Sequence, residues 1–153
     1  SKSFNVTGAR ISFLVGRPDV IAACKKLRTQ IDFGMFLPVQ KAAIAALTGP
    51  LDSVKRQCGE YQARRDALCG GLRSIGWNVP DSHGSMFVWA PLPTGYTDSM
   101  AFCLELIDKA GVICTPGFSF GPSGEGYVRF ALTLPVERIR EAVASIAASG
   151  MIR

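Results

Sequence analysis

The sequence predicts an α/β protein in two parts that are joined by one long helix. Three observations lead to this prediction. Residues 11–16 are an apolar run without helical periodicity, which is typical of a strand buried on both faces of a parallel sheet. From Leu51 to Ile75, apolar residues recur every three or four positions, as they do along one amphipathic helix. Beyond Gly76, strand and helix patterns alternate.

Length and composition narrow the class of protein. A chain of 153 residues is long enough for one domain with a core, or for a small domain plus a piece of a neighbouring one. No apolar run approaches the roughly 20 residues that span a bilayer, and no signal-peptide pattern opens the chain. We therefore expect a soluble, cytoplasmic protein that has no membrane partner.

Charge and metal-ligand residues argue against two further classes. The net charge is +5; Lys25, Lys26 and Arg28 lie on one predicted helix, and the other cations are scattered. Arginines alternate with acids in Glu60, Arg64 and Asp66, as on a solvated helix face, so we expect no nucleic-acid partner. His83 is the only histidine, and no CxxC pair occurs, so we expect no metal site. Five cysteines with apolar neighbours are expected to be buried thiols in a reducing compartment: Cys24, Cys58, Cys69, Cys103 and Cys114.

The first part of the chain begins with a loop, residues 1–10, that leads into the strand expected at 11–16. The partner strands of that strand are expected upstream of Ser1. Proline at a first helical position predicts helices at 18–28 and 38–47, the second closed by Gly49. Between these helices lies an apolar loop, 31–37, which we expect to pack against another surface.

The second part follows the long helix at 51–75. Strands are predicted at 86–90, 112–115 and 127–134, and helices at 98–109 and from Pro135 to Gly150. Asp98 or Thr97 is expected to cap the first of these helices, and Gly111 to end it. The glycine-rich stretch 116–126 lacks the GK[ST] ending of a phosphate-binding P-loop, so we interpret it as a loop shaped by its backbone.

Three cationic side chains stand out as candidates for chemistry. Lys2 precedes the predicted buried strand by a short loop, which is a defined setting for an amine that attacks a carbonyl. Arg10, eight residues later, offers a planar fork that suits a phosphate. Arg129 interrupts an apolar strand on the face opposite to its hydrophobic neighbours, where it either reaches solvent or binds a carboxylate in a cleft.

These motifs resemble those of a known family. The segment from Ser1-Lys2 to Gly8-Ala9-Arg10-Ile11 is similar to the cofactor-attachment motif of the class I/II pyridoxal-phosphate-dependent aminotransferases of fold type I. Ser12 departs from the glycine or alanine that is usual in that motif. The stretches 87–91, 109–112 and 116–121 are also similar to the family, and most resemble the branch with LL-diaminopimelate and aspartate aminotransferases.

The resemblance implies a fold and a site. Residues 1–50 would be the C-terminal remnant of the large cofactor-binding domain, and 51–153 the interdomain helix and the small α/β domain. Lys2 would hold pyridoxal 5'-phosphate as a Schiff base, Arg10 would bind its phosphate, and Ser1 would add a hydroxyl contact. Arg129 would bind the α-carboxylate of the substrate. The partners implied are an amino acid, a 2-oxo acid and a second subunit in a homodimer.

Two other functions are compatible with these motifs, and some of the residues that the family uses to bind its cofactor are missing. A carbon–sulfur lyase or decarboxylase of the same fold would carry the same lysine motif. An aminotransferase-like domain can also serve as the ligand-sensing part of a transcriptional regulator. The acid that pairs with the cofactor's pyridine nitrogen and the aromatic ring that stacks on it are not found here, so we expect a C-terminal fragment that is inactive alone.

Overall fold

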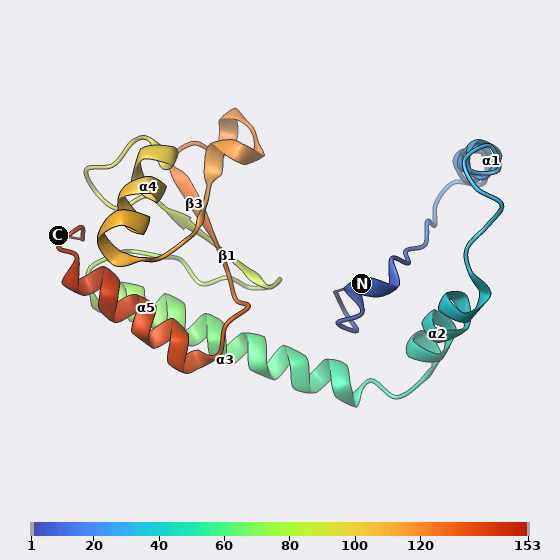
Figure 1. Cartoon of the computed structure of the whole chain (residues 1–153), viewed down its shortest axis with the longest axis horizontal. Coiled ribbons are helices and arrows are strands. Elements are labelled where there is room, and N and C mark those ends of the chain that lie inside the picture. The colour runs from blue at the N-terminus through green and yellow to red at the C-terminus, as the bar shows by residue number, and fades with distance from the viewer. Residues whose placement is uncertain (1, 153) are drawn as a thin grey trace. The chain divides into compact units, whose positions relative to one another are not determined.

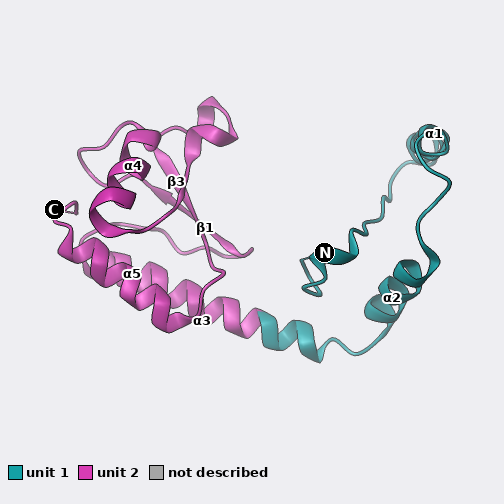
Figure 2. Ribbon diagram, in the orientation of Figure 1, with its two compact units in different colours: residues 1–57 teal, residues 58–153 magenta. Residues whose placement is uncertain are grey.

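The computed structural model describes residues 2–152, and the chain divides into two compact units, Ser1–Gln57 and Cys58–Arg153 (Figures 1 and 2). Unit 1 contains the 3-10 helix η1 (Thr7–Ala9), helices α1 (Pro18–Arg28) and α2 (Leu37–Thr48), and the start of the long helix α3 (Asp52–Ser74). The three predicted helices are therefore confirmed. None of the helices within residues 2–152 is long and apolar enough to cross a membrane.

The prediction of a strand at 11–16 is wrong for this chain. The residues follow an irregular path, and Phe13, Leu14 and Val15 expose 74, 61 and 79% of their surface. A strand forms only when a neighbouring strand satisfies its N–H and C=O groups, and unit 1 has no other strand in its described part. Residues 11–16 have the composition of a buried strand, but the described part of unit 1 contains no strand with which they could pair.

Unit 1 has no core of its own. None of residues 2–57 is buried, and its largest apolar side chains face outward. In the apolar loop before α2, Phe33 and Phe36 are exposed to 112 and 73%. Burial of apolar surface is the dominant stabilising term in folding, so this unit derives little stability from its own contacts.

Unit 2 combines the rest of α3 with a three-stranded antiparallel sheet and two further helices, α4 (Ser99–Ala110) and α5 (Val136–Ala148). Figure 1 labels these helices together with β1 and β3. Its strands are β1 (Phe87–Pro91), β2 (Thr115–Pro116) and β3 (Tyr127–Ala131), in the order β1-β3-β2. The predicted strand at 112–115 is thus shorter and shifted toward its end. The stretch predicted as a loop contains two 3-10 turns, η2 (Gly117–Phe120) and η3 (Pro122–Gly124).

The core of unit 2 lies between one face of this sheet and the helices. Trp77 is at its centre: its ring meets those of Phe102 and Phe130 edge to face, with centroids 5.3 and 5.7 Å away, and its indole N–H donates to the carbonyl of Pro91. Alternation along β3 places Val128 and Phe130 in the core. Leu132, the next residue in this alternation, is also buried, whereas Leu134 is 52% exposed because it lies beyond the strand end.

The cysteine prediction is only partly confirmed. Cys69, Cys103 and Cys114 are buried free thiols, and burial raises the pKa of all three. Cys24 and Cys58 are exposed, because no described residue covers the helix faces on which they lie. Apolar neighbours in the sequence therefore predicted burial correctly only where unit 2 provides a core.

Helix α4 begins as the sequence predicts. The side chain of Asp98 accepts hydrogen bonds from the backbone N–H groups of Met100 and Ala101, both at 2.9 Å. Glu125 joins this helix start to the glycine-rich stretch, since one carboxylate oxygen accepts from the N–H groups of Gly126 and Ser99. These N–H groups hold the pKa of Glu125 below its usual value.

The two 3-10 turns are locked together by a close contact between glycines. A Cβ on Gly117 would lie 1.9 Å from the carbonyl oxygen of Gly124, and one on Gly124 would lie 2.1 Å from that of Gly117. Both glycines are buried. Neither position has room for a side chain, so this contact fixes the path of η2, which carries Phe120.

We expect Gly117→Ala to destabilise unit 2 by about 3 kcal/mol or more, because the methyl group forces the two backbones apart. Chemical denaturation of the 153-residue chain, followed by tryptophan fluorescence, measures the effect, since both tryptophans lie in unit 2. Gly84→Ala is the matched control, because a Cβ there meets nothing within 4 Å. An unchanged denaturation midpoint in Gly117→Ala would contradict the role of this contact.

Candidate active site

Lys2 and Arg10 lie in one irregular segment of unit 1. Lys2 is exposed in a turn, where its carbonyl oxygen accepts hydrogen bonds from the N–H of Asn5 at 3.2 Å and from Nε2 of Gln57 at 3.1 Å. The second bond ties the lysine backbone to helix α3. Ser1, the third cofactor contact expected from the sequence, lies outside the described residues.

Arg10 ends η1 in a left-handed backbone conformation, with φ of 50°. This conformation costs a non-glycine residue about 1 kcal/mol or more. Arg10 is exposed, and its Nη1 lies 3.4 Å from the carbonyl oxygen of Thr7. A left-handed residue is common at a helix end, so this conformation belongs to the end of η1.

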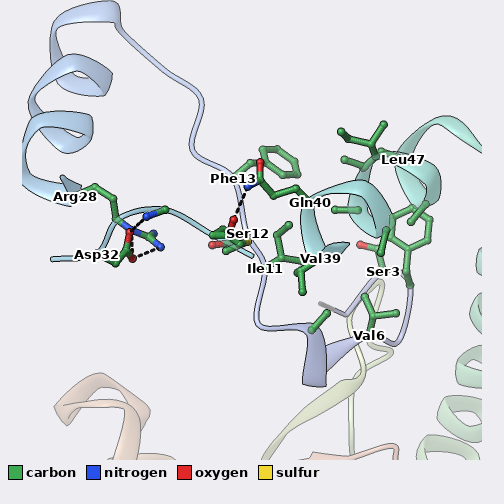
Figure 3. A pocket seen from close by; sticks show the side chains of 18 residues that line it. Ser3, Val6, Ile11, Ser12, Phe13, Arg28, Asp32, Val39, Gln40 and Leu47 are labelled. Carbon is green, nitrogen blue, oxygen red and sulfur yellow. Dashed lines mark hydrogen bonds and ion pairs between the residues drawn. The ribbon is translucent and has the colours of Figure 1, made fainter. Parts of the chain in front are cut away.

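A hollow of about 1010 Å³ lies beside α2 in unit 1 (Figure 3). Its lining is mainly apolar, and its charged part is the ion pair of Arg28 and Asp32. Neither Lys2 nor Arg10 lines it. Because its lining is mainly apolar, this hollow suits an apolar group and does not suit the phosphate that Arg10 was predicted to bind.

Arg129 lies on the sheet face of unit 2 that is turned away from the core. The antiparallel register pairs it with Trp89 of β1 and with Thr115 of β2. Its guanidinium carbon lies 4.2 Å from the ring centre of Phe87 and 4.5 Å from that of Phe120. Its Nε is buried and has no hydrogen-bond partner among the described residues. The side chain is therefore held against two phenylalanine rings on this face and is not simply extended into solvent.

The sequence did not indicate Phe87 and Phe120 as parts of this site. Phe87 stood out only as a strand residue, and Phe120 as part of a glycine-rich loop. The available signal was the two-residue alternation along β1 and β3, which puts Phe87 and Arg129 on the same face once the strands are paired. That pairing is a long-range contact, and only the structure supplies it.

Comparison with known proteins gives these residues a context. Residues 1–146 match the sequence model of the family "Aminotransferase class I and II". An LL-diaminopimelate aminotransferase from Dehalococcoides mccartyi is 45% identical over 147 residues, which are 96% of this chain and 38% of that protein. One from Halothermothrix orenii is 46% identical over 143 residues, or 94% of this chain and 36% of that protein.

Solved structures agree with these relatives. Substrate-bound BacF from Bacillus subtilis superposes with a TM-score of 0.92 at 32% identity, over 97% of this chain and 38% of that one. An aromatic aminotransferase from Pyrococcus horikoshii superposes with a TM-score of 0.91 at 28% identity, over 97% of this chain and 40% of that one. The chain thus spans about two fifths of the length of the proteins it matches, and it belongs to the class I and II aminotransferase family.

Proposed function

We propose that this chain provides the cofactor lysine and the carboxylate-binding arginine of an aminotransferase, which moves an amino group between an amino acid and a 2-oxo acid. The observation that carries the proposal is Arg129, a guanidinium on a non-core sheet face whose Nε has no partner in the described part of the chain. Family membership and the lysine segment support it.

Aminotransferases of this family depend on pyridoxal 5'-phosphate, and the residues present fit that cofactor. Lys2 and Arg10 are exposed in one segment and combine a primary amine, which can condense with an aldehyde, with a guanidinium suited to a phosphate. The cofactor, when bound, supplies the electron sink that stabilises negative charge at the substrate α-carbon. Ser1 completes the proposed set with a hydroxyl contact.

Lys2 has two roles in this proposal. Its Nζ would hold the cofactor covalently as long as no substrate is bound. When it is not bonded to the cofactor, the same Nζ would act as the base that takes the proton from the substrate α-carbon. Since the same atom performs both steps, its loss is expected to be more damaging than the loss of any binding residue.

Arg129 orients the substrate. A guanidinium and a carboxylate form two parallel hydrogen bonds, which fix the direction of the α-carbon as well as its position. Orientation decides which bond of the α-carbon is broken, so Arg129 contributes to the choice of reaction as well as to affinity.

We further propose the assembly, location and domain roles that the resemblance implies. The exposed Phe33 and Phe36 support a homodimer in which this loop reaches the neighbouring subunit. An odd number of cysteines supports a reducing, cytoplasmic location. Residues 1–50 are assigned to the large domain and 51–153 to the interdomain helix and small domain.

Product analysis on the intact protein tests the proposed reaction. With LL-diaminopimelate, the amino acid in the names of the curated relatives, and a 2-oxo acid, we expect a new 2-oxo acid and a new amino acid in equal amounts. A carbon–sulfur lyase would release a thiol from a sulfur-containing amino acid, and a decarboxylase would release carbon dioxide. Either of these products without amino transfer would contradict the proposal.

The isolated 153-residue chain is expected to show no amino transfer with added pyridoxal phosphate. Unit 1 buries none of residues 2–57, so it provides no packed core that would hold the Lys2 side chain rigidly against a cofactor. Formation of the 2-oxo acid, compared with that of a Lys2→Ala chain, is the measurement. Full activity that disappears in Lys2→Ala would show that these residues are sufficient and would refute the proposed incompleteness.

A further inference from the structure

The guanidinium of Arg129 contacts aromatic rings, whereas most of the other described arginines pair with a carboxylate. Six arginines form ion pairs with aspartate or glutamate side chains: Arg17, Arg28, Arg64, Arg65, Arg73 and Arg138. Arg129 forms none within the described residues and lies instead over two phenylalanine rings. The face of an aromatic ring attracts a cation electrostatically, but it does not occupy the N–H donors of a guanidinium with strong hydrogen bonds as a carboxylate does.

The two rings come from different elements. Phe87 is on β1 and is half-buried, two positions from the residue that pairs with Arg129. Phe120 closes η2 and is 50% exposed. Trp89 supports Phe120 edge to face, with centroids 5.5 Å apart, and stacks on Tyr127 at the same distance. The rings therefore belong to a small aromatic cluster around one cation.

The segment that carries Phe120 is fixed by contacts unrelated to Arg129. The hydroxyl of the fully buried Ser99 accepts a hydrogen bond from the N–H of Phe118 at 3.3 Å. The close approach of Gly117 and Gly124 fixes the same turn from its other side. Phe120 is thus held in place independently of the guanidinium, as a residue that positions another must be.

We propose that Phe87 and Phe120, here called the aromatic clamp, are positioning residues that hold the Arg129 guanidinium for a substrate carboxylate while leaving its N–H donors free. The inference rests on the proposed function, because it assumes that Arg129 binds that carboxylate. An acidic partner in place of the clamp would occupy the same donors and compete with the substrate. The clamp avoids this competition.

The test compares leucine substitutions of the clamp in the intact protein. Leucine keeps an apolar side chain and removes the ring, so Phe87→Leu and Phe120→Leu are each expected to raise KM for the amino acid about five- to tenfold and to leave kcat within about twofold. The dissociation constant of acetate, which binds without reacting, is expected to rise by a similar factor. Phe120→Tyr, which keeps the ring, is expected to retain the wild-type KM.

Phe118→Leu is the matched control. Phe118 lies in the same short helix and is 44% exposed, and its ring has no ring or guanidinium contact in the described part of the chain. Its KM and acetate affinity are expected to stay at the wild-type values. Thermal unfolding of each variant separates a local effect on Arg129 from a general loss of structure.

The outcomes separate the clamp from the function on which it rests. Unchanged KM and acetate affinity in both clamp variants, with a raised KM in Arg129→Lys, would overturn the clamp and leave the proposed function intact. An unchanged KM in Arg129→Lys itself would overturn both. Equal losses in Phe120→Leu and Phe120→Tyr would also overturn the clamp, because the ring would then not be the feature that matters.

Discussion

Replacing Lys2 by alanine in the intact protein is expected to lower kcat by about four orders of magnitude or more, because one atom holds the cofactor and moves the proton. Lys2→Arg is expected to be equally inactive. Arginine keeps the positive charge, but its guanidinium is always protonated and cannot attack a carbonyl. The comparison therefore distinguishes the need for a nucleophile from the need for a charge.

Lys55→Ala is the control for this prediction. Lys55 is an exposed lysine on α3 in the same structural unit, and within residues 2–152 no side-chain hydrogen bond or ion pair joins it to Lys2 or Arg10. Its rate is expected to equal that of the wild type. A Lys2→Ala protein with more than about a tenth of wild-type kcat would exclude Lys2 as the catalytic lysine.

Replacing Arg129 by alanine is expected to lower kcat/KM for amino acids by about 10²- to 10⁴-fold. Two charge-assisted hydrogen bonds are lost, each contributing about 1.5 to 3 kcal/mol. Arg129→Lys is expected to fall between this variant and the wild type, since lysine keeps the charge and loses the planar fork. Steady-state kinetics on one amino acid at several concentrations gives the comparison.

A comparison of an amino acid with an amine that lacks its carboxylate tests whether the effect of Arg129 depends on that carboxylate. The wild-type protein is expected to prefer an amino acid strongly over the amine with the same side chain, and Arg129→Ala is expected to lose most of that preference. Arg138→Ala is the control, because Arg138 is an exposed arginine of α5 paired with Glu141. If Arg129→Ala lowered activity on both substrates equally, the role in carboxylate binding would be contradicted.

The helices of this chain could be predicted from local signals. Pro18 and Pro38 mark helix starts, Asp98 caps α4, and Gly111 ends it in a left-handed conformation. Such signals act over a few residues, so they survive in any context in which the helix forms.

Features that depend on distant partners could not be predicted in the same way. The run at 11–16 has the composition of a buried strand, but a strand also needs a pairing partner, and composition does not provide one. Phe120 could not be placed beside Arg129 because their contact joins a 3-10 turn to a strand across the fold of unit 2. Arg129 itself was identifiable because strand alternation alone separates it from its apolar neighbours.

Reduction of the cofactor-loaded intact protein with borohydride, followed by proteolysis and mass spectrometry, tests the central claim most directly. Borohydride makes the link between pyridoxal phosphate and its lysine permanent, so the modified residue can be identified. We expect the phosphopyridoxyl group on the peptide that runs through Lys2 to Arg10, and its absence from that peptide in Lys2→Ala. Its appearance on any other lysine of the wild-type protein would contradict the account.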